Sequence, residues 1–372
     1  MNNENIKVTV YLSTYNQEKY VAEALDSILM QKTDFRYEII AADDCSTDDT
    51  QKIILEYQKK HPGIIETYFT NPNVGGCKKL TDCIDKGLFR GEYLAYLEGD
   101  DYWLGEDRLQ TLVDFLEEHP EYSRVSHRRK VINQNGEDCG YDIDASVLGK
   151  PFYMEDFLAG RQYSDFGSVF RNYFKEAGTR YHALLQSSRN VCDFQDMFIT
   201  QDFGPVFVMD ACYGVYRSVS AAGASNYNSI TTQAARNREN IRLARTVEQF
   251  YGGKYDLSPM IRRNQNRLLS DAAAAQDTEA WQAARENVTV DEMRSIVPEI
   301  LYVAKRGRKT AETAFILAML TAEEKKNLSL SVMKYAVRRA YEKMRHIPHD
   351  DRKRGFIVIP KESPNESAND RN

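Results

Sequence analysis

Polar and acidic residues follow three hydrophobic segments in the N-terminal part of the chain. Residues 13–16 (STYN) end the first segment, residues 43–44 (DD) follow the second, and residues 98–101 (EGDD) end the third. Acidic side chains that meet in one place repel each other unless a cation or hydrogen-bond donors compensate them. Mg²⁺ and Mn²⁺ prefer carboxylate and phosphate oxygens as ligands. The pattern therefore predicts a divalent-metal site that also binds a phosphorylated ligand.

Each acidic group also has a simpler interpretation when it is taken alone. The aspartates of residues 43–49 could cap a helix, because aspartate is a preferred N-cap residue, and residues 100–101 could form a polar turn. Neither interpretation explains why the acids follow successive hydrophobic segments.

The segments around these acids alternate between strand and helix patterns. Short hydrophobic runs predict strands at residues 8–13, 37–42, 64–69 and 93–97. Apolar residues recur at helical spacing in residues 20–29, 53–57, 80–88 and 109–116. This alternation predicts an α/β fold with a mostly parallel, Rossmann-like sheet and helices on both faces. Ligands of such sheets bind beyond the carboxyl ends of the strands, where the acidic residues lie.

The rest of the chain changes character twice. Residues 122–216 combine strand patterns (RVSHRRKVI, GPVFVMD) with turns. Residues 231–344 have a helical pattern, with breaks expected at Gly252-Gly253 and near Pro298. The final polar residues, KESPNESANDRN, are expected to be disordered.

Composition limits the class of protein. With 42% hydrophobic residues and a net charge of −6 over 372 residues, the chain is expected to fold. Residues 305–354 hold fourteen Lys and Arg against six Asp and Glu, which gives +8 there and −14 elsewhere. This asymmetry indicates either an anionic partner or a solvated helix face. We expect no nucleic-acid partner, and the sequence predicts no particular oligomeric state.

The cysteines and the N-terminus bear on localisation. Six cysteines have neither metal-type nor paired spacing, and the chain shows no signal peptide or membrane-spanning run. We therefore expect a cytoplasmic protein. Lys305, Arg306, Arg308 and Lys309 precede the apolar residues 315–320, which suits an interfacial helix in peripheral contact with the inner membrane face. Burial of this stretch in a helical bundle is the alternative.

Five motifs, in order, resemble glycosyltransferase family 2, an inverting family with the GT-A fold. They are VYLSTYNQEKYVAEALDSILMQ, EIIAADDCSTDDT, NPNVGG, GEYLAYLEGDDYW and CDFQDMF, and the resemblance covers roughly residues 6–217. It implies a metal-dependent enzyme with Mn²⁺ or Mg²⁺ as cofactor. The implied reaction moves a sugar from a nucleoside-diphosphate sugar, a UDP-sugar first, to a hydroxyl of a glycan, polysaccharide or lipid-linked acceptor.

The resemblance also implies a domain organisation. A GT-A catalytic domain would span residues 1–225, with a nucleotide-binding half at 1–120 and an acceptor-side half at 121–225. A helical region would follow at 226–355, and a tail at 356–372.

The same resemblance assigns a donor site. Ser13 and Tyr15 would contact the nucleotide base, and Asp44 would accept the imide N–H of uracil. Asp100 would approach the ribose, and Asp101 would bind the metal.

An inverting transfer also needs a carboxylate that takes the proton of the acceptor hydroxyl. The resemblance places this base at Asp196, at the start of an apolar helix, with Asp193 as competitor and a plain N-cap as alternative. Arg217 would meet the diphosphate, or be an ordinary strand-end residue. Glu98 stands where many relatives have aspartate, and Val219 where relatives often have histidine.

Four nearby residues are expected to be structural. Trp103 would belong to the core, and His127 would be a structural histidine on a strand. Lys78 and Lys79 would lie at the solvated start of a helix rather than face phosphates.

Two other enzyme classes would require a different sequence in the loop after the first predicted strand. A sugar-phosphate nucleotidyltransferase would carry a glycine-rich loop with Arg and Lys there, and a dehydrogenase would carry Gly-x-Gly-x-x-Gly, whereas this chain has STYNQEKY. A catalytically impaired nucleotide-sugar-binding or scaffolding module stays open because of Glu98 and Val219.

Overall fold

The computed structural model describes residues 6–140, 143, 145–163, 167–190, 192–219, 231–286, 288–306, 309–326, 328, 331–332 and 334–335. The predicted tail at 356–372, the end of the predicted helical region and the basic residue Arg308 lie outside the described residues. The same holds for the side chains of Lys305 and Arg306.

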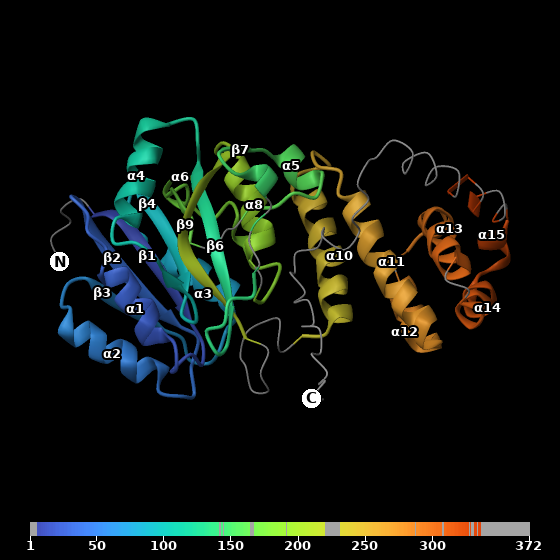
Figure 1. The fold of residues 1–372 in the computed structure, drawn as a ribbon, viewed down its shortest axis with the longest axis horizontal. Coiled ribbons are helices and arrows are strands. Elements are labelled where there is room, and N and C mark those ends of the chain that lie inside the picture. Colours follow the sequence, from blue (N-terminus) through green and yellow to red (C-terminus); the bar gives the residue numbers. More distant parts are fainter. Residues whose placement is uncertain are drawn as a thin grey trace, which may run out of the picture.

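The described strands form one mixed sheet (Figure 1). Its order is β3(Ile65–Phe69), β2(Arg36–Asp43), β1(Ile6–Thr14), β4(Tyr93–Glu98), β8(Val169–Arg171), β6(Arg124–Asn133), β9(Val206–Ser218) and β5(Tyr102–Trp103), with β7(Lys150–Phe152) on β9. β1 pairs in parallel with β2 and β4, β2 with β3, and β6 with β9. The short β8 runs antiparallel between the two parallel groups. The predicted α/β class and the predicted strands are confirmed.

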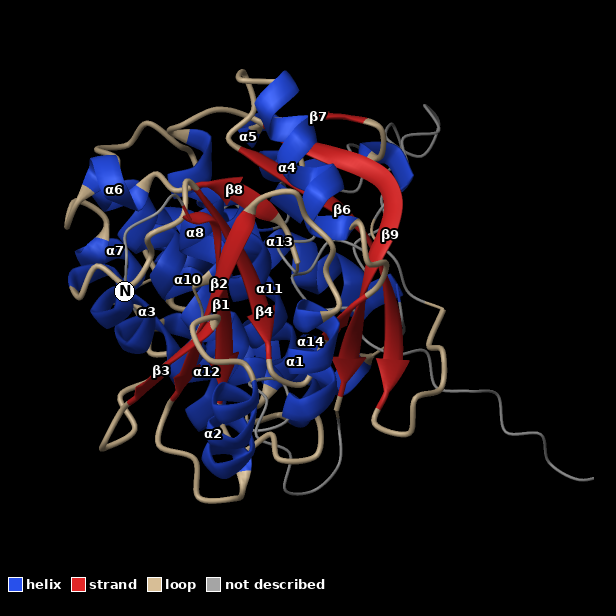
Figure 2. Ribbon diagram, turned by 90° about the vertical axis from the view of Figure 1, so that its left-hand side faces the viewer, coloured by secondary structure: helices blue, strands red, loops and turns tan. Residues whose placement is uncertain are grey.

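Helices cover both faces of this sheet (Figure 2). They are α1(Val21–Leu29), α2(Thr50–Lys60), α3(Gly76–Asp85), α4(Arg108–Glu118), α5(Met154–Leu158), α6(Phe174–Ala177), α7(His182–Leu185) and α8(Asp193–Gln201). Buried residues of α1 and α4 pack in one core, and those of α3, α7 and α8 in another.

Alternation along β1 explains the two layers, because successive strand residues point to opposite faces. Val8, Val10 and Leu12 belong to the core under α1 and α4, whereas Tyr11 belongs to the core under α8. A strand buried on both faces reads as a continuous hydrophobic run, as this one does.

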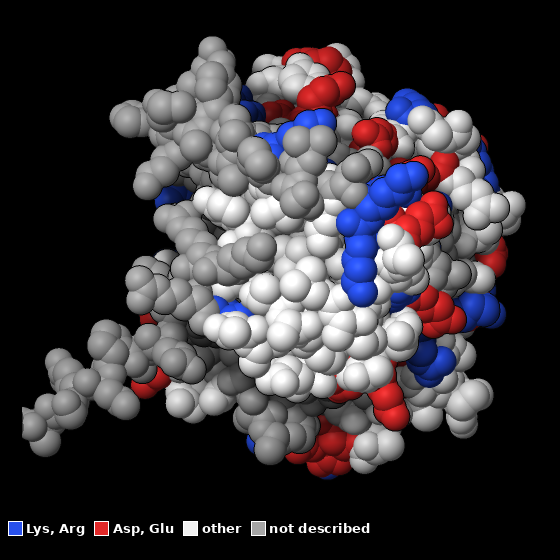
Figure 3. All heavy atoms as spheres, turned by 90° about the vertical axis from the view of Figure 1, so that its right-hand side faces the viewer, with Lys and Arg blue, Asp and Glu red and all other residues white. Residues whose placement is uncertain are grey.

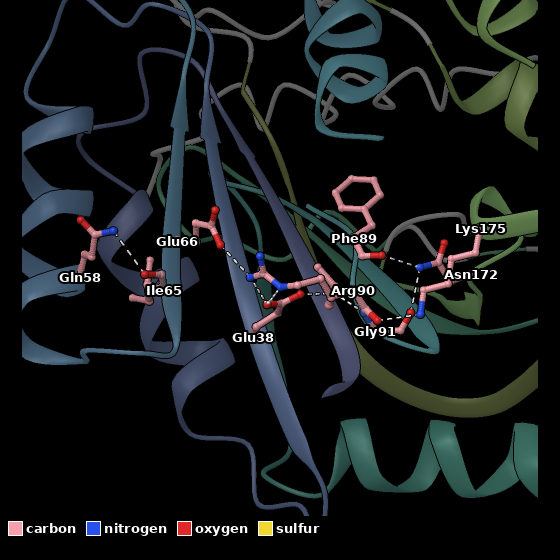
Figure 4. Close-up of polar contacts among 10 residues, drawn as sticks. Glu38, Gln58, Ile65, Glu66, Phe89, Arg90, Gly91, Asn172 and Lys175 are labelled. Carbon is pink, nitrogen blue, oxygen red and sulfur yellow. Dashed lines mark hydrogen bonds and ion pairs between the residues drawn. The ribbon is translucent and has the colours of Figure 1, made fainter. Parts of the chain in front are cut away.

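A polar cluster joins the amino-terminal ends of the strands (Figure 4). The acidic residues follow the opposite, carboxyl-terminal ends. The buried Glu38 accepts hydrogen bonds from Thr9 Oγ1 at 2.6 Å and from Arg90 Nε at 2.8 Å. Arg90 also pairs with Glu66, with 2.7 Å between Nη2 and Oε2. The Gly91 N–H donates to Thr9 Oγ1 at 2.8 Å. These bonds join β1, β2, β3 and the turn before β4, which fixes the strands whose other ends carry the acids.

Beyond residue 230 the described chain is helical. The helices are α10(Gln233–Phe250), α11(Ser258–Ala275), α12(Thr278–Arg285), α13(Val290–Arg306), α14(Thr310–Met319) and α15(Ala322–Lys325). Figure 1 shows them extending to one side of the sheet. The predicted break at Gly252-Gly253 is confirmed, since both glycines lie between α10 and α11 with positive φ.

The predicted break near Pro298 is wrong, because α13 runs through this proline. A proline removes one helical hydrogen bond and crowds the preceding turn. The inner face of α13 buries Ile296, Val297, Ile300 and Leu301, and this burial outweighs the local cost.

The larger core does not end at residue 225. It continues into Leu243, Ala244 and Val247 of α10 and Ile261 of α11, while a separate core joins the second half of α11 to α14. Packing therefore continues past the predicted boundary between residues 225 and 226. The boundary itself stays a prediction.

The apolar stretch 315–320 lies in the helical bundle. Ile316 and Leu320 are buried, and the Phe315 and Trp281 rings meet edge to face with centroids 5.8 Å apart. Among the described residues, no helix combines the length and apolar character needed to cross a membrane. At this end of the molecule, Figure 3 shows described charges of both signs scattered around an uncharged area.

Candidate active site

The carboxyl ends of β1, β2 and β4 lie side by side, as predicted. Thr14 pairs with Asp43 in the β1–β2 ladder, and Ser13 pairs with Glu98 in the β1–β4 ladder. The polar residues that follow three separate hydrophobic segments therefore meet at one edge of the sheet.

Asp43 organises the turn that follows β2. Its Oδ1 accepts from the Ser46 N–H at 2.8 Å and from Gln51 Nε2 at 2.6 Å, and its Oδ2 accepts from Thr14 Oγ1 at 2.9 Å. This buried carboxylate therefore holds the loop that follows β2.

Asp44 holds a second loop, that of residues 70–75. Its Oδ1 accepts from Thr70 Oγ1 at 2.7 Å and from the Val74 N–H at 2.8 Å, and its Oδ2 accepts from the Gly75 N–H at 2.8 Å. A carboxylate oxygen can accept more than one hydrogen bond, so these contacts are compatible with an additional donor on a ligand.

Gly75 joins this loop to the segment before α8. Its φ of +92° favours glycine, and an added Cβ would lie 2.5 Å from the Arg189 side chain. The next residue but one, Cys77, donates its N–H to the Arg189 carbonyl at 3.1 Å. The loop of residues 70–75 and the segment before α8 are thus packed against each other.

Ser13 and Tyr15 lie where the nucleotide base is expected. Tyr15 is 37% exposed directly after β1, so part of its side chain is accessible to solvent. Ser13 donates to the Glu98 carboxylate and accepts from Lys79 Nζ at 3.2 Å. Glu98, the departure from the family pattern, is thereby tied to Ser13.

Lys79 is buried among the strand tips, so its predicted solvated position is wrong. The residue is 1% exposed, and Nζ donates to the Thr14 carbonyl at 3.1 Å and the Ala42 carbonyl at 3.0 Å. Desolvation lowers the pKa of Lys79, while the charges of Glu98, Asp44 and Asp43 oppose this effect. The chain itself therefore supplies one cation to the acidic edge.

Replacement of Lys79 by methionine is expected to lower the free energy of unfolding by about 3 kcal/mol, because buried acceptors and carboxylates lose their cation. Lys78→Met is the matched control: Lys78 is 49% exposed and pairs only with Asp82 on its own helix, so its loss costs less than about 0.5 kcal/mol. Urea denaturation measures both. Equal losses for the two variants would contradict the assigned role of Lys79.

Asp100 and Asp101 form the turn after β4, and β9 holds it. Asp101 is 2% exposed, and its Oδ1 accepts from the Arg217 N–H at 2.7 Å. The Asp100 carbonyl accepts from Arg217 Nε at 2.9 Å. β9, which ends the acceptor-side half, therefore positions the predicted metal ligand.

Electrostatics make this turn receptive to a cation. Desolvation raises the pKa of Asp100 to about 6, against the opposing Arg217 charge. Desolvation, then the charges of Asp100 and Glu98, raise the pKa of Asp101 well above its usual range. A bound cation would relieve this excess of negative charge.

The residues fit a divalent metal whose coordination is completed by the ligand. One oxygen of Asp101 accepts the Arg217 N–H, and the carboxylate offers a second oxygen. Among the described residues, no group of three His, Cys, Asp or Glu side chains is arranged to hold a metal. Phosphate oxygens of a ligand would have to supply the remaining ligands, which is how Mg²⁺ commonly binds.

The Arg217 guanidinium lies toward α1. Its Nη2 donates to Glu23 Oε2 at 2.7 Å, and its carbon lies 4.5 Å from the Tyr20 ring centroid. The side chain is 7% exposed. A role at the diphosphate stays a prediction, whereas its contacts with the 100–101 turn are structural.

Asp196 is part of a buried ion pair. It is 5% exposed; Oδ2 accepts from Arg124 Nη2, and Oδ1 accepts from the Tyr173 hydroxyl. Arg124 is fully buried, with its guanidinium 4.3 Å from the Phe170 ring centroid. Both oxygens of Asp196 thus serve contacts inside the protein.

Asp193 is the exposed carboxylate of the same helix. It is the first residue of α8, and solvent reaches its side chain. The surrounding protein nevertheless partly desolvates this carboxylate. Desolvation and the Asp196 charge raise the pKa of Asp193, while the Arg129 charge lowers it. Its charge also acts on Glu98, so α8 begins close to the tip of β4.

Trp103 and His127 are structural. Trp103 is 1% exposed beneath the Arg108 guanidinium, which lies 3.8 Å from its ring centroid. His127 is fully buried, and Nδ1 donates to the Arg128 carbonyl at 2.7 Å. Desolvation and the Arg108 charge lower the pKa of His127 to about 3, so it stays neutral.

A family model for glycosyl transferase family 2 matches residues 9–183, from β1 into α7. Residues 9–183 thus have the sequence of a glycosyl transferase family 2 region. The predicted resemblance is confirmed, and the acidic turn after β4 lies inside the matched region.

Two of the relatives illustrate the similarity of the N-terminal part of this chain. An uncharacterized protein of Mycobacterium tuberculosis is 42% identical over 123 residues, 33% of this chain and 35% of that protein. The poly(ribitol-phosphate) beta-N-acetylglucosaminyltransferase TarS of Staphylococcus aureus is 35% identical over 117 residues, 31% of this chain and 19% of TarS. The chain thus spans less than half of either relative.

A solved structure supports the predicted GT-A fold. The crystal structure of S. aureus TarS 1–349 in complex with UDP-GlcNAc matches with a TM-score of 0.53 at 18% identity, over 89% of this chain and 92% of that chain. The similarity extends past the region that the family model covers.

Three features of this site were not predicted: the burial of Lys79, the exposure of Asp193 in place of Asp196, and the position of Arg129. Arg129 lies on β6 with its guanidinium 4.8 Å from the Tyr216 ring centroid, and its charge acts on both Asp101 and Asp193. The run RVSHRRKVI signals a strand with basic residues, but it does not indicate which of them faces the acids.

Proposed function

We propose that this protein is an inverting, metal-dependent glycosyltransferase that moves a sugar from a nucleoside-diphosphate sugar to an acceptor hydroxyl. The observation that carries the proposal is that the tips of β1, β2 and β4 meet at one edge of the sheet, where β9 holds Asp101, while Asp193 is exposed at the start of α8. One carboxylate suits a metal on the diphosphate, and the other suits the acceptor.

The donor occupies the tips of β1, β2 and β4 in this proposal. Tyr15 stacks on the base, Ser13 lines its edge, and Asp44 accepts the imide N–H of uracil while it keeps its loop contacts. Asp100 approaches the ribose. Asp101 holds Mn²⁺ or Mg²⁺, which when bound neutralises charge on the diphosphate.

For the base, the geometry favours Asp193 over our sequence-based choice, Asp196. A general base must reach the acceptor hydroxyl, and Asp193 is exposed whereas both oxygens of Asp196 are engaged by Arg124 and Tyr173. Its raised pKa makes Asp193 a better proton acceptor near neutral pH. Asp193 takes the hydroxyl proton as the acceptor oxygen bonds to the anomeric carbon and the diphosphate leaves with the electrons of the broken bond.

The proposed substrate class rests on the name of the TarS relative and on the ligand in its solved structure. The TarS relative is named for transfer of N-acetylglucosamine to poly(ribitol-phosphate), and its structure was solved with UDP-GlcNAc. These names support a UDP-sugar and a glycan, polysaccharide or lipid-linked acceptor. A cytoplasmic location, with α10 to α15 contacting the acceptor or the inner membrane face, completes the proposal.

A thermal-shift panel of UDP-, GDP- and dTDP-sugars, each with and without Mn²⁺, tests this function. We expect one donor to raise the melting temperature with Mn²⁺ far more than without it, because ligand binding stabilises the folded state. The selected donor should then release its nucleoside diphosphate slowly in the absence of acceptor. Binding without any release would favour the nucleotide-sugar-binding module instead.

A further inference from the structure

The cationic side chains near the proposed diphosphate position lie on different faces of the sheet. Arg217 lies on the face covered by α1, where it contacts Glu23 and Tyr20. The base candidate Asp193 starts α8, which packs on the opposite face. Arg217 therefore does not lie on the α8 face of the site, where Lys79 already binds the Thr14 and Ala42 carbonyls.

Arg129 lies on the α8 face. Successive residues of a strand point to opposite faces, so Tyr216 faces away from the side that Arg217 occupies. The Arg129 guanidinium stacks on Tyr216, with 4.8 Å from its carbon to the ring centroid. β6 and β9 pair in parallel here, with Arg129 opposite Gly214, so the two side chains are held by adjacent strands of the sheet.

Strand pairing places Arg129 beside the turn that carries Asp101. Arg129 pairs with Gly214 of β9, and Gly214 in turn pairs with Trp103 of β5, two residues after Asp101. Asp101 itself is held by the N–H of Arg217, the residue after Tyr216. The Arg129 charge also acts on Asp193 at the start of α8. The guanidinium therefore lies near the metal ligand, on the face where α8 begins.

We propose that Arg129 stabilises the negative charge that develops on the leaving diphosphate. When the bond between the anomeric carbon and the diphosphate oxygen breaks, its electron pair passes to the diphosphate, and the N–H donors of Arg129 bind that charge without transferring a proton. A planar guanidinium matches phosphate oxygens in two-point fashion, and stacking on Tyr216 orients it beforehand. This inference rests on the proposed function.

Arg129→Gln tests the inference with the donor that the panel selects. We expect kcat to fall about 100-fold for donor hydrolysis without acceptor and by the same factor for transfer, because one fixed donor to developing charge is lost. KM for the donor should change much less, and Arg129→Lys should recover part of kcat. Arg128→Gln is the control: this neighbour is 39% exposed and pairs with Asp210, so both rates should match wild type.

A binding measurement separates failure of this inference from failure of the proposed function. By calorimetry with Mn²⁺, Arg129→Gln should bind UDP about tenfold more weakly while its affinity for UMP is unchanged. Wild-type rates and UDP affinity in a folded Arg129→Gln variant would overturn the inference alone, and so would a loss confined to transfer, which would place Arg129 at the acceptor. A wild-type protein that binds no nucleoside diphosphate would overturn the proposed function and this inference together.

Discussion

Replacement of Asp193 by asparagine is expected to lower the rate of sugar transfer by about 1000-fold while donor binding is retained. The amide has the size of the carboxylate but cannot take the proton of the acceptor hydroxyl, and a positioned base contributes about 10²- to 10⁴-fold. Asp193 is exposed at the first turn of α8, so the replacement removes no buried contact. Transfer kinetics, together with the donor-induced thermal shift, measure the two properties separately.

Asp196→Asn is the matched comparison on the same helix. It weakens the buried pair with Arg124, whose guanidinium has no solvent access, so we expect the free energy of unfolding to fall by about 3 kcal/mol. The folded fraction should keep most of its transfer activity. If Asp196→Asn abolished transfer at full stability while Asp193→Asn remained active, the base would be Asp196, as the sequence motif suggested.

The strands and their tips could be predicted because the signal is local. Val8, Val10 and Leu12 point to one core and Tyr11 to the other, so a continuous hydrophobic run is what a doubly covered strand requires. The end of that run also fixes where the polar residues lie. The position of Asp101 follows in the same way from the end of the hydrophobic run at residues 93–97.

Other parts depend on contacts between distant segments. Lys79 looks like a helix-surface residue, and only the packing of α3 against the sheet brings its ammonium to Thr14 and Ala42. The burial of Asp196 depends on Arg124, 72 residues earlier in the chain. No local pattern reports such a partner, so a motif of two aspartates on one helix could not show which of them is exposed.

The same argument explains the error at Pro298. Proline breaks helices in isolation, but the residues around Pro298 bury a continuous apolar face against α11 and α14. Helix propensity alone predicts little where tertiary packing is extensive. The sequence could therefore predict a helical region but not its exact subdivision.

Asp101→Asn is expected to have opposite effects on the metal-free and the donor-bound protein. Burial raises the pKa of Asp101 in the folded state, so the ionised carboxylate costs stability at neutral pH, and this cost grows as pH rises from the unfolded-state pKa toward the folded-state pKa. The neutral amide avoids that cost, and the metal-free variant should melt at or above the wild-type temperature at pH 7. It should nevertheless lose the additional thermal shift that a nucleotide sugar gives with Mn²⁺, and its transfer rate should fall about 1000-fold, because it lacks the carboxylate that holds the cation on the diphosphate.

Glu98→Gln is the control for Asp101→Asn. Because Glu98 is bonded to Ser13, this variant should keep most of the Mn²⁺-dependent shift. A full shift in Asp101→Asn with loss of the shift in Glu98→Gln would move the metal to Glu98.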